Sequence, residues 1–149
     1  MQIQQINQSD AERVLISVKN VDGGGSITTG MGVCLVQAAA SADGISSVRA
    51  TKALSRGFVG VSKGDIAING FGLVTAFGHA ASVLISQSVG SWTITSGDCL
   101  QTGGTGAFTS VLLLENLSTM CFRYVIQAGS VSDTISNPLQ YVSGIVRAI

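Results

Sequence analysis

Large and small side chains alternate along the centre of the chain. Between residues 71 and 86, the odd positions carry most of the large apolar side chains, and the even positions carry most of the small ones. Successive side chains of a β-strand point to opposite faces, so a period of two over this length predicts a strand. Gly72 and Gly78 disfavour a helix. We therefore expect one long bent strand, or two strands joined at Gly78, with a small-residue face that another backbone can approach closely.

Shorter segments with a similar pattern are predicted to be further strands. In the segment 14–19, β-branched residues at every second position favour a strand, even though Ser9 and Glu12 have the spacing of a helix capping box. The segment 141–149 fits a helical face as well as a strand face, and Gly144 favours the strand. The predicted strands are 14–19, 33–36, 71–86, 91–95, 111–115, 120–128 and 141–149.

Glycine-rich turns separate these segments. Residues 22–25 read Asp-Gly-Gly-Gly, which predicts a turn, because a phosphate-binding loop would continue with Gly-Lys-Ser or Gly-Lys-Thr. The segment 26–30 resembles 93–97, and 66–70 is a looser third copy. Each copy places a β-branched residue just before a glycine turn, so each is expected to be a corner between two strands.

Together these patterns define the expected fold class and its organisation. Many short strands, glycine-rich turns and almost no helix signal predict an all-β fold, a β-barrel or sandwich of short antiparallel strands. Residues 1–12 are polar and rich in Gln and Asn, and are expected to form an extended N-terminal arm. Residues 13–149 are then expected to form a single all-β domain.

The composition adds one property of the surface. Charged residues make up 11% of the 149 residues, against about 25% in ordinary soluble domains, and eight basic residues balance eight acidic ones. Because self-repulsion between copies is weak, such a surface tends to associate. The charge depletion therefore favours burial of the surface in an assembly, and the alternative is a small glycine-rich monomer.

The charge pattern also bears on nucleic acid and membrane partners. Nucleic-acid binding needs an excess of Lys and Arg on one face, but the basic residues between 49 and 63 are flanked by Asp43 and Asp65. The uncharged segment 66–97 is interrupted by polar residues and glycines, so it is not expected to cross a membrane. The first five residues lack the pattern of a signal peptide. We expect no nucleic-acid partner and no membrane.

The sequence predicts no catalytic, cofactor-binding or metal-binding motif. Cys34, Cys99 and Cys121 lack metal-ligand spacing and are expected to be reduced, buried thiols, and His79 has no companion ligand nearby. A nucleophilic triad around His79 would need a Gly-x-Ser-x-Gly elbow, which does not occur. A thiolate at Cys121 would need a more basic environment than Arg123 alone provides. We expect the protein not to be an enzyme.

Two carboxylates allow a different interpretation. Asp65 and Asp98 both lie in glycine-containing turns, where they could form a paired acid site or a cation site. Asp also accepts backbone N–H bonds in turns, which is the interpretation we favour. The loop Gly103–Gly106 does not satisfy the dinucleotide-binding pattern G-x-G-x-x-G.

An ordered series of turn glycines and strand residues resembles a known family. The series is Gly-Phe-Val-Gly-Val-Ser-Lys-Gly-Asp-Ile-Ala at 57–67, Gly-Phe-Gly-Leu-Val at 70–74, Thr-Ser-Gly-Asp-Cys-Leu at 95–100 and Gly-Ile-Val-Arg-Ala-Ile at 144–149. It resembles the capsid decoration (cement) proteins of tailed bacteriophages. The resemblance implies a β-rich protein, generally oligomeric and often trimeric, bound at symmetry axes of the capsid lattice. The loop at 103–106 and the three cysteines depart from it.

The resemblance gives the expected function. The protein would be a structural virion protein that binds the outside of a phage capsid as a homotrimer and cements neighbouring major capsid subunits. It would need no cofactor, and it would assemble in the host cytoplasm onto the capsid surface. The alternatives are another virion or tail structural protein, or a glycan-binding β-barrel module, whose sugars would stack on Trp92, Tyr124 or Tyr141. The candidate capsid contacts are Gln2, Gln4, Gln5, Asn7, Arg49, Lys52 and Arg56.

Overall fold

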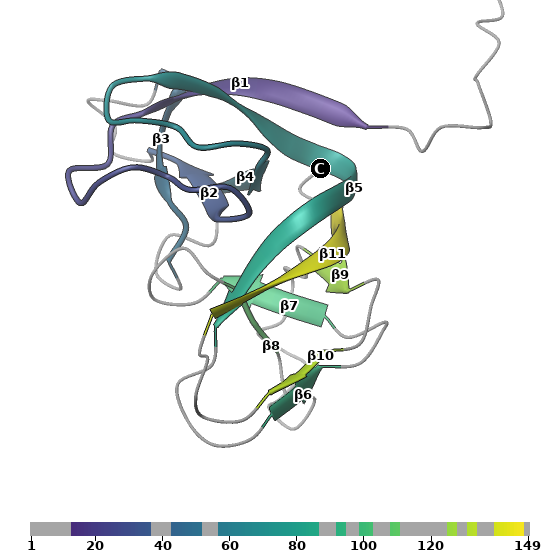
Figure 1. Cartoon of the computed structure of the whole chain (residues 1–149). Helices are drawn as coiled ribbons and strands as arrows, with labels where there is room; N and C mark the ends of the chain where they lie inside the picture. Colours follow the sequence, from purple (N-terminus) through teal and green to yellow (C-terminus); the bar gives the residue numbers. More distant parts are fainter. Residues whose placement is uncertain are drawn as a thin grey trace, which may run out of the picture.

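The structure, a computed structural model, consists of β-strands joined by turns (Figure 1). It describes residues 13–36, 43–51, 57–86, 92–94, 99–102, 108–110, 125–127, 131–133 and 139–147. Within these ranges there is no helix that is long and apolar enough to cross a membrane. The strands are β1 (Val14–Asn20), β2 (Gly32–Leu35), β3 (Ser46–Arg49), β4 (Phe58–Ser62), β5 (Phe71–Ser86), β6 (Trp92–Ile94), β7 (Cys99–Thr102), β8 (Phe108–Ser110), β9 (Val125–Gln127), β10 (Val131–Asp133) and β11 (Leu139–Arg147).

The first five strands close into a β-barrel. Their order is β1-β3-β2-β4-β5, and β1 pairs again with β5 to complete the ring. All of these pairings are antiparallel except that of β1 with β3, which is parallel at Lys19 and Ser46. Closure leaves the barrel no unpaired sheet edge. The predicted all-β fold class is confirmed, and of its two forms the structure shows the barrel.

Strand β5 extends beyond this barrel and enters a second set of strands. It bends at Gly78, whose φ of 97° is in the region that favours glycine, so the prediction of one long bent strand is confirmed. The second half of β5 pairs with β11, and β9, β7 and β8 are the next strands in the order of the sheet. Strand β8 also pairs with β5, at Ile85. Figure 1 shows β5 running from the upper barrel into the lower group. The strand predicted for the C-terminal tail is β11.

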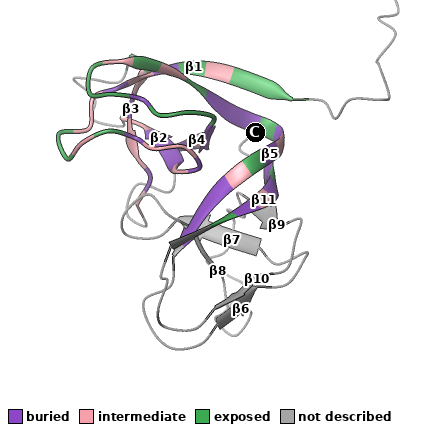
Figure 2. Cartoon of the chain, viewed as in Figure 1, coloured by how far each residue is buried: buried purple, intermediate pink, exposed green. Residues whose placement is uncertain are grey.

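Two apolar clusters lie on opposite faces of the barrel wall. Figure 2 shows the buried parts of the strands in purple. In β2, Val33 belongs to the cluster inside the barrel, and its neighbour Cys34 belongs to the other cluster. The inner cluster is Val18, Ile27, Val33, Ile66 and Val74. The other cluster joins the outside of β2 and β4 to the second half of β5 and to β11, and consists of Cys34, Ala50, Phe58, Val61, Ala80, Val83, Ile85, Val142 and Val146. Burial of each large apolar side chain contributes about 1.5–3 kcal/mol.

Two of the three similar turn segments lie side by side. Ile27 and Ile66 form an isolated antiparallel bridge, with reciprocal N–H···O bonds of 3.0 and 2.7 Å. Both side chains are fully buried in the barrel interior. The expectation that these segments are strand corners is confirmed for 26–30 and 66–70, since each lies between two barrel strands. Residues 95–97 of the third segment lie outside the described residues.

Other predictions concern segments that the structure does not describe. The N-terminal arm at 1–12 and the strand at 111–115 lie entirely outside the described residues, and the strand at 120–128 is described only at β9. The division into an arm and a single domain stays a prediction.

Candidate functional site

A pocket of about 100 Å³ lies in the angle of bent β5. It is lined by Thr75 before the bend and by His79 and Ser82 after it. Arg13, which precedes β1, and Lys63, which follows β4, complete its polar lining together with Thr29 and Ser62. Three basic side chains and four hydroxyls from separate elements therefore meet in one small space.

The basic side chains of the pocket are free of intrachain ion pairs, as far as the structure describes the chain. Arg13 and Lys63 are both exposed, and neither forms a salt bridge with a described carboxylate. Arg13 Nη2 lies 3.4 Å from His79 Nδ1. A guanidinium can only donate, so Nδ1 is the acceptor in this contact. The pocket therefore presents N–H donors and positive charge.

The four hydroxyls differ in their hydrogen bonds. Ser62 Oγ donates to the Thr28 carbonyl at 2.6 Å, and Thr29 Oγ1 donates to Asp65 Oδ1 at 2.9 Å. In contrast, the side chains of Thr75 and Ser82 have no hydrogen-bond partner among the described residues, although Thr75 is only 4% exposed. Buried hydroxyls usually have a protein, water or ligand partner, so Thr75 indicates that the pocket takes a polar occupant.

Asp65 has the structural role expected of a turn carboxylate. Its Oδ1 accepts bonds from the Thr29 backbone N–H at 2.7 Å and from the Thr29 hydroxyl, which lower the pKa of Asp65. Asp65 is outside the pocket lining, and Asp98 is outside the described residues. Within the described ranges, no group of three or more His, Cys, Asp or Glu side chains could hold a metal ion.

Cys34 is a buried thiol, as expected. It is free, and burial raises the pKa of its thiol to about 12. At neutral pH the group is therefore protonated and poorly nucleophilic. The side chains of Cys99 and Cys121 are not described.

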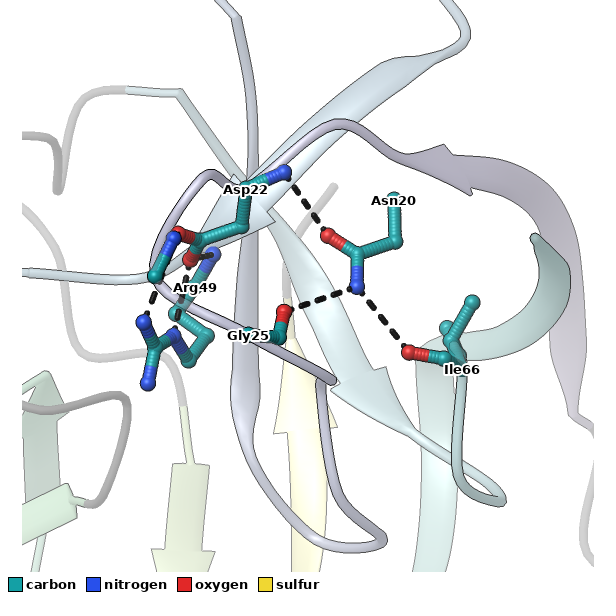
Figure 3. Close-up of polar contacts among 6 residues, drawn as sticks. Asn20, Asp22, Gly25, Arg49 and Ile66 are labelled. Atoms are coloured by element: carbon teal, nitrogen blue, oxygen red, sulfur yellow. Dashed lines mark hydrogen bonds and ion pairs between the residues drawn. The ribbon is translucent and has the colours of Figure 1, made fainter. Parts of the chain in front are cut away.

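Arg49, one of the expected capsid contacts, binds within the chain (Figure 3). Its Nε lies 2.8 Å from Asp22 Oδ2, and its backbone N–H also donates to this oxygen at 3.1 Å. The Arg49 hydrogen bond lowers the pKa of Asp22 to about 2, assisted by the Gly24 N–H and opposed by burial. A capsid contact through Arg49 stays a prediction. The other expected contacts, Gln2, Gln4, Gln5, Asn7, Lys52 and Arg56, lie outside the described residues.

The ion pair gives a stability prediction with a defined pH dependence. Asp22 is 16% exposed, so screening is moderate, and Asp22→Asn should lower the free energy of unfolding by about 1–2 kcal/mol at pH 7. Since the folded-state pKa is lowered from 3.8 to about 2, the contribution is complete above pH 3.8 and is lost as the pH falls toward 2. Urea unfolding at several pH values measures it. A difference from the wild type that stays constant down to pH 2 would contradict the assignment.

Exposed apolar side chains share one face of the paired strands β1 and β5. We call it the outer apolar face and define it by Leu15 of β1 and by Phe71 and Leu73 of β5. Leu15 is paired with Thr75, Ser17 with Leu73 and Lys19 with Phe71, so Leu15, Leu73 and Phe71 share one side of the sheet. Phe71 is 68% exposed. Apolar side chains grouped in this way commonly mark an interaction surface.

The aromatic side chains proposed for glycan stacking are only partly described. Tyr141 is 58% exposed and belongs to β11, opposite Leu84. The side chain of Trp92 is not described, and Tyr124 lies outside the described residues. Glycan binding stays an alternative prediction.

Comparisons with known proteins find similarity to a solved structure but to no family. The chain matches no protein-family model, and it matches no curated protein. It is similar to the N base of head fiber gp8.5 of bacteriophage phi29, with 13% sequence identity and a TM-score of 0.49, over 92% of this chain and 96% of that one. A TM-score below 0.5 does not establish a shared fold, so the proposals below rest on the residues of this chain.

Proposed function

We propose that the chain is a structural protein of a phage virion, which binds the outside of the capsid and joins neighbouring major capsid subunits. The observation that carries this proposal is the outer apolar face, with Phe71 and Leu73 exposed on one strand. The resemblance of the sequence to capsid decoration proteins indicates that the partner would be the major capsid protein. A protein with this function works by covering other surfaces and needs no catalytic residues.

The outer apolar face is proposed to pack against a second copy of this chain. A stable interface buries about 800 Å² on each partner and has an apolar core depleted of charge. The outer apolar face supplies such a core, and a chain with 11% charged residues and no net charge opposes self-association only weakly. Repeating the contact around a three-fold axis would give the homotrimer.

The trimer would then bind the shell through several weak contacts at once. The polar residues 1–12 and the basic residues Arg49, Lys52 and Arg56 are proposed to contact the major capsid protein. Linked contacts can raise the overall affinity by about 10²–10⁴ over that of a single contact. Loss of the trimer should therefore weaken capsid binding even where every capsid-contacting residue is intact.

The double variant Phe71→Ser, Leu73→Ser tests this proposal. Both side chains are exposed, so the monomer should fold, while the apolar core of the interface is lost. We expect a trimer for the wild type and a monomer for the variant in sedimentation velocity. We also expect the affinity for undecorated capsids to fall about 100-fold or more, measured by co-sedimentation.

Tyr141→Ser is the matched control, because it removes an exposed aromatic side chain from β11 outside the outer apolar face. It should leave both measurements unchanged. A double variant that remains trimeric would show that another surface joins the copies. Wild-type protein that fails to bind undecorated capsids at stoichiometric concentration would contradict the decoration function itself.

A further inference from the structure

We propose that the pocket in the angle of β5 binds a small tetrahedral dianion, phosphate or sulfate. This proposal is independent of the outer apolar face and of any capsid partner. It rests on the convergence of Arg13, Lys63 and His79 and on the unpartnered hydroxyl of Thr75.

The charge of the pocket is the first argument. Arg13 and Lys63 are positively charged and exposed, and they form no salt bridge with the carboxylates that the structure describes. Among the described residues, no carboxylate lines the pocket, and Asp65, two residues after Lys63, directs its Oδ1 to the backbone N–H and hydroxyl of Thr29. The two cations therefore have no direct ion-pair partner among the described residues, and an anion bound in the pocket would provide one.

Thr75 provides the second, independent argument. Thr75 is 4% exposed and lines the pocket, and its side chain has no hydrogen-bond partner among the described residues. Leaving a buried hydroxyl unpaired costs about 1–3 kcal/mol. Since Thr75 lines the same space as Arg13 and Lys63, an oxyanion that accepts a hydrogen bond from its hydroxyl would remove this cost.

The number of fixed charges selects the class of anion. A carboxylate carries one negative charge and would compensate only one of Arg13 and Lys63. Phosphate carries about 1.5–2 negative charges at neutral pH, and sulfate carries two. Donors from β5, from the start of β1 and from the end of β4 surround the pocket, so several oxygens of a tetrahedral group can each find a donor.

Titration of the full chain with inorganic phosphate at constant ionic strength tests the proposal. We expect saturable changes in the ¹H–¹⁵N NMR signals of Thr75, His79 and Ser82. Lys63→Gln and Arg13→Gln should each weaken the affinity about tenfold or more, since each removes a charged donor. Lys63→Arg should retain most of it. Lys19→Gln removes a cation of β1 that is outside the pocket lining, and should leave the affinity within about twofold of the wild type.

Thr75→Val separates a ligand-binding role from a structural one. Valine has nearly the same shape but no hydroxyl, so in phosphate-free buffer the variant should be as stable as the wild type or more stable. The same variant should bind phosphate about tenfold more weakly. A loss of stability without phosphate would show that the hydroxyl has an intrachain partner, and would overturn this argument.

The remaining outcomes decide the ligand class. Sulfate that competes with phosphate would support the tetrahedral dianion. Acetate that binds as tightly as phosphate would overturn that assignment. Signal changes that do not saturate, or an equal effect of Lys19→Gln and Lys63→Gln, would show non-specific attraction and overturn the site.

Discussion

Gly60→Ala is expected to lower the free energy of unfolding by about 3 kcal/mol or more. Gly60 has a φ of 147°, and a Cβ there would overlap the Thr75 carbonyl oxygen and approach Val74 Cγ1 at 2.8 Å. The overlap is with the backbone of β5, which rotamer changes cannot relieve. Strain at the positive φ adds about 1–3 kcal/mol to the cost of moving β4 away from β5. Urea unfolding followed by circular dichroism measures the change.

Gly25→Ala separates these two causes. Gly25 has a similar φ of 136°, but nothing lies within 4 Å of the position that its Cβ would take. This variant should therefore show the strain alone, about 1–2 kcal/mol. If the two variants lose equal stability, the contact between β4 and β5 contributes nothing, and the close pairing of these strands is not what requires glycine at position 60.

Asn20→Ala is expected to be similarly severe, at about 3–5 kcal/mol. Asn20 is fully buried, and its Nδ2 donates to the carbonyls of Gly25 and Ile66 at 3.1 and 3.0 Å (Figure 3). Its Oδ1 accepts the backbone N–H of Asp22 at 2.9 Å. Removal of the amide leaves the Gly25 carbonyl and the Asp22 N–H without this partner, while the Ile66 carbonyl keeps its bond from the Ile27 N–H. Each buried unpaired group costs about 1–3 kcal/mol.

The comparison of Asn20→Asp with Asn20→Ala tests whether these bonds are the cause. Aspartate keeps the volume and the Oδ1 acceptor, but it places a second oxygen against the carbonyls of Gly25 and Ile66. It should be at least as destabilising as alanine at pH 7, because burial of an uncompensated charge adds to the lost donors. Thermal unfolding gives the comparison. An aspartate variant with near wild-type stability would show that shape alone matters at this position.

Strand β5 was predictable because its pattern is local and long. Alternation over residues 71–86 specifies a strand, and Gly78 marks the bend. By contrast, the sequence pattern does not identify β3, since Ser46 and Ser47 break the apolar alternation of this short strand. Ser47 is nevertheless buried, and its hydroxyl keeps a hydrogen-bond partner there by donating to the Lys19 carbonyl at 3.0 Å. Tertiary pairing, which a local pattern does not contain, forms that strand.

The pocket could not be predicted for the same reason. Arg13, Lys63 and Thr75 carry no shared motif, and they meet only because β1 closes onto β5 and β5 then bends. His79 has no companion ligand near it in the sequence, because Arg13, which contacts it in the structure, lies 66 residues earlier in the chain. Likewise, the sequence around Arg49 does not show that its side chain has an ion-pair partner. That partner is Asp22, which lies 27 residues earlier in the chain.

The single strand shared by the barrel and the second group of strands has a mechanical consequence. A tensile load applied to one group reaches the other along the covalent backbone of β5, with no flexible linker between them. Its antiparallel neighbours β1 and β11 hold it on either side of Gly78, so such a load shears many hydrogen bonds together instead of peeling them off singly. The two groups should therefore yield together, as one event in a pulling experiment.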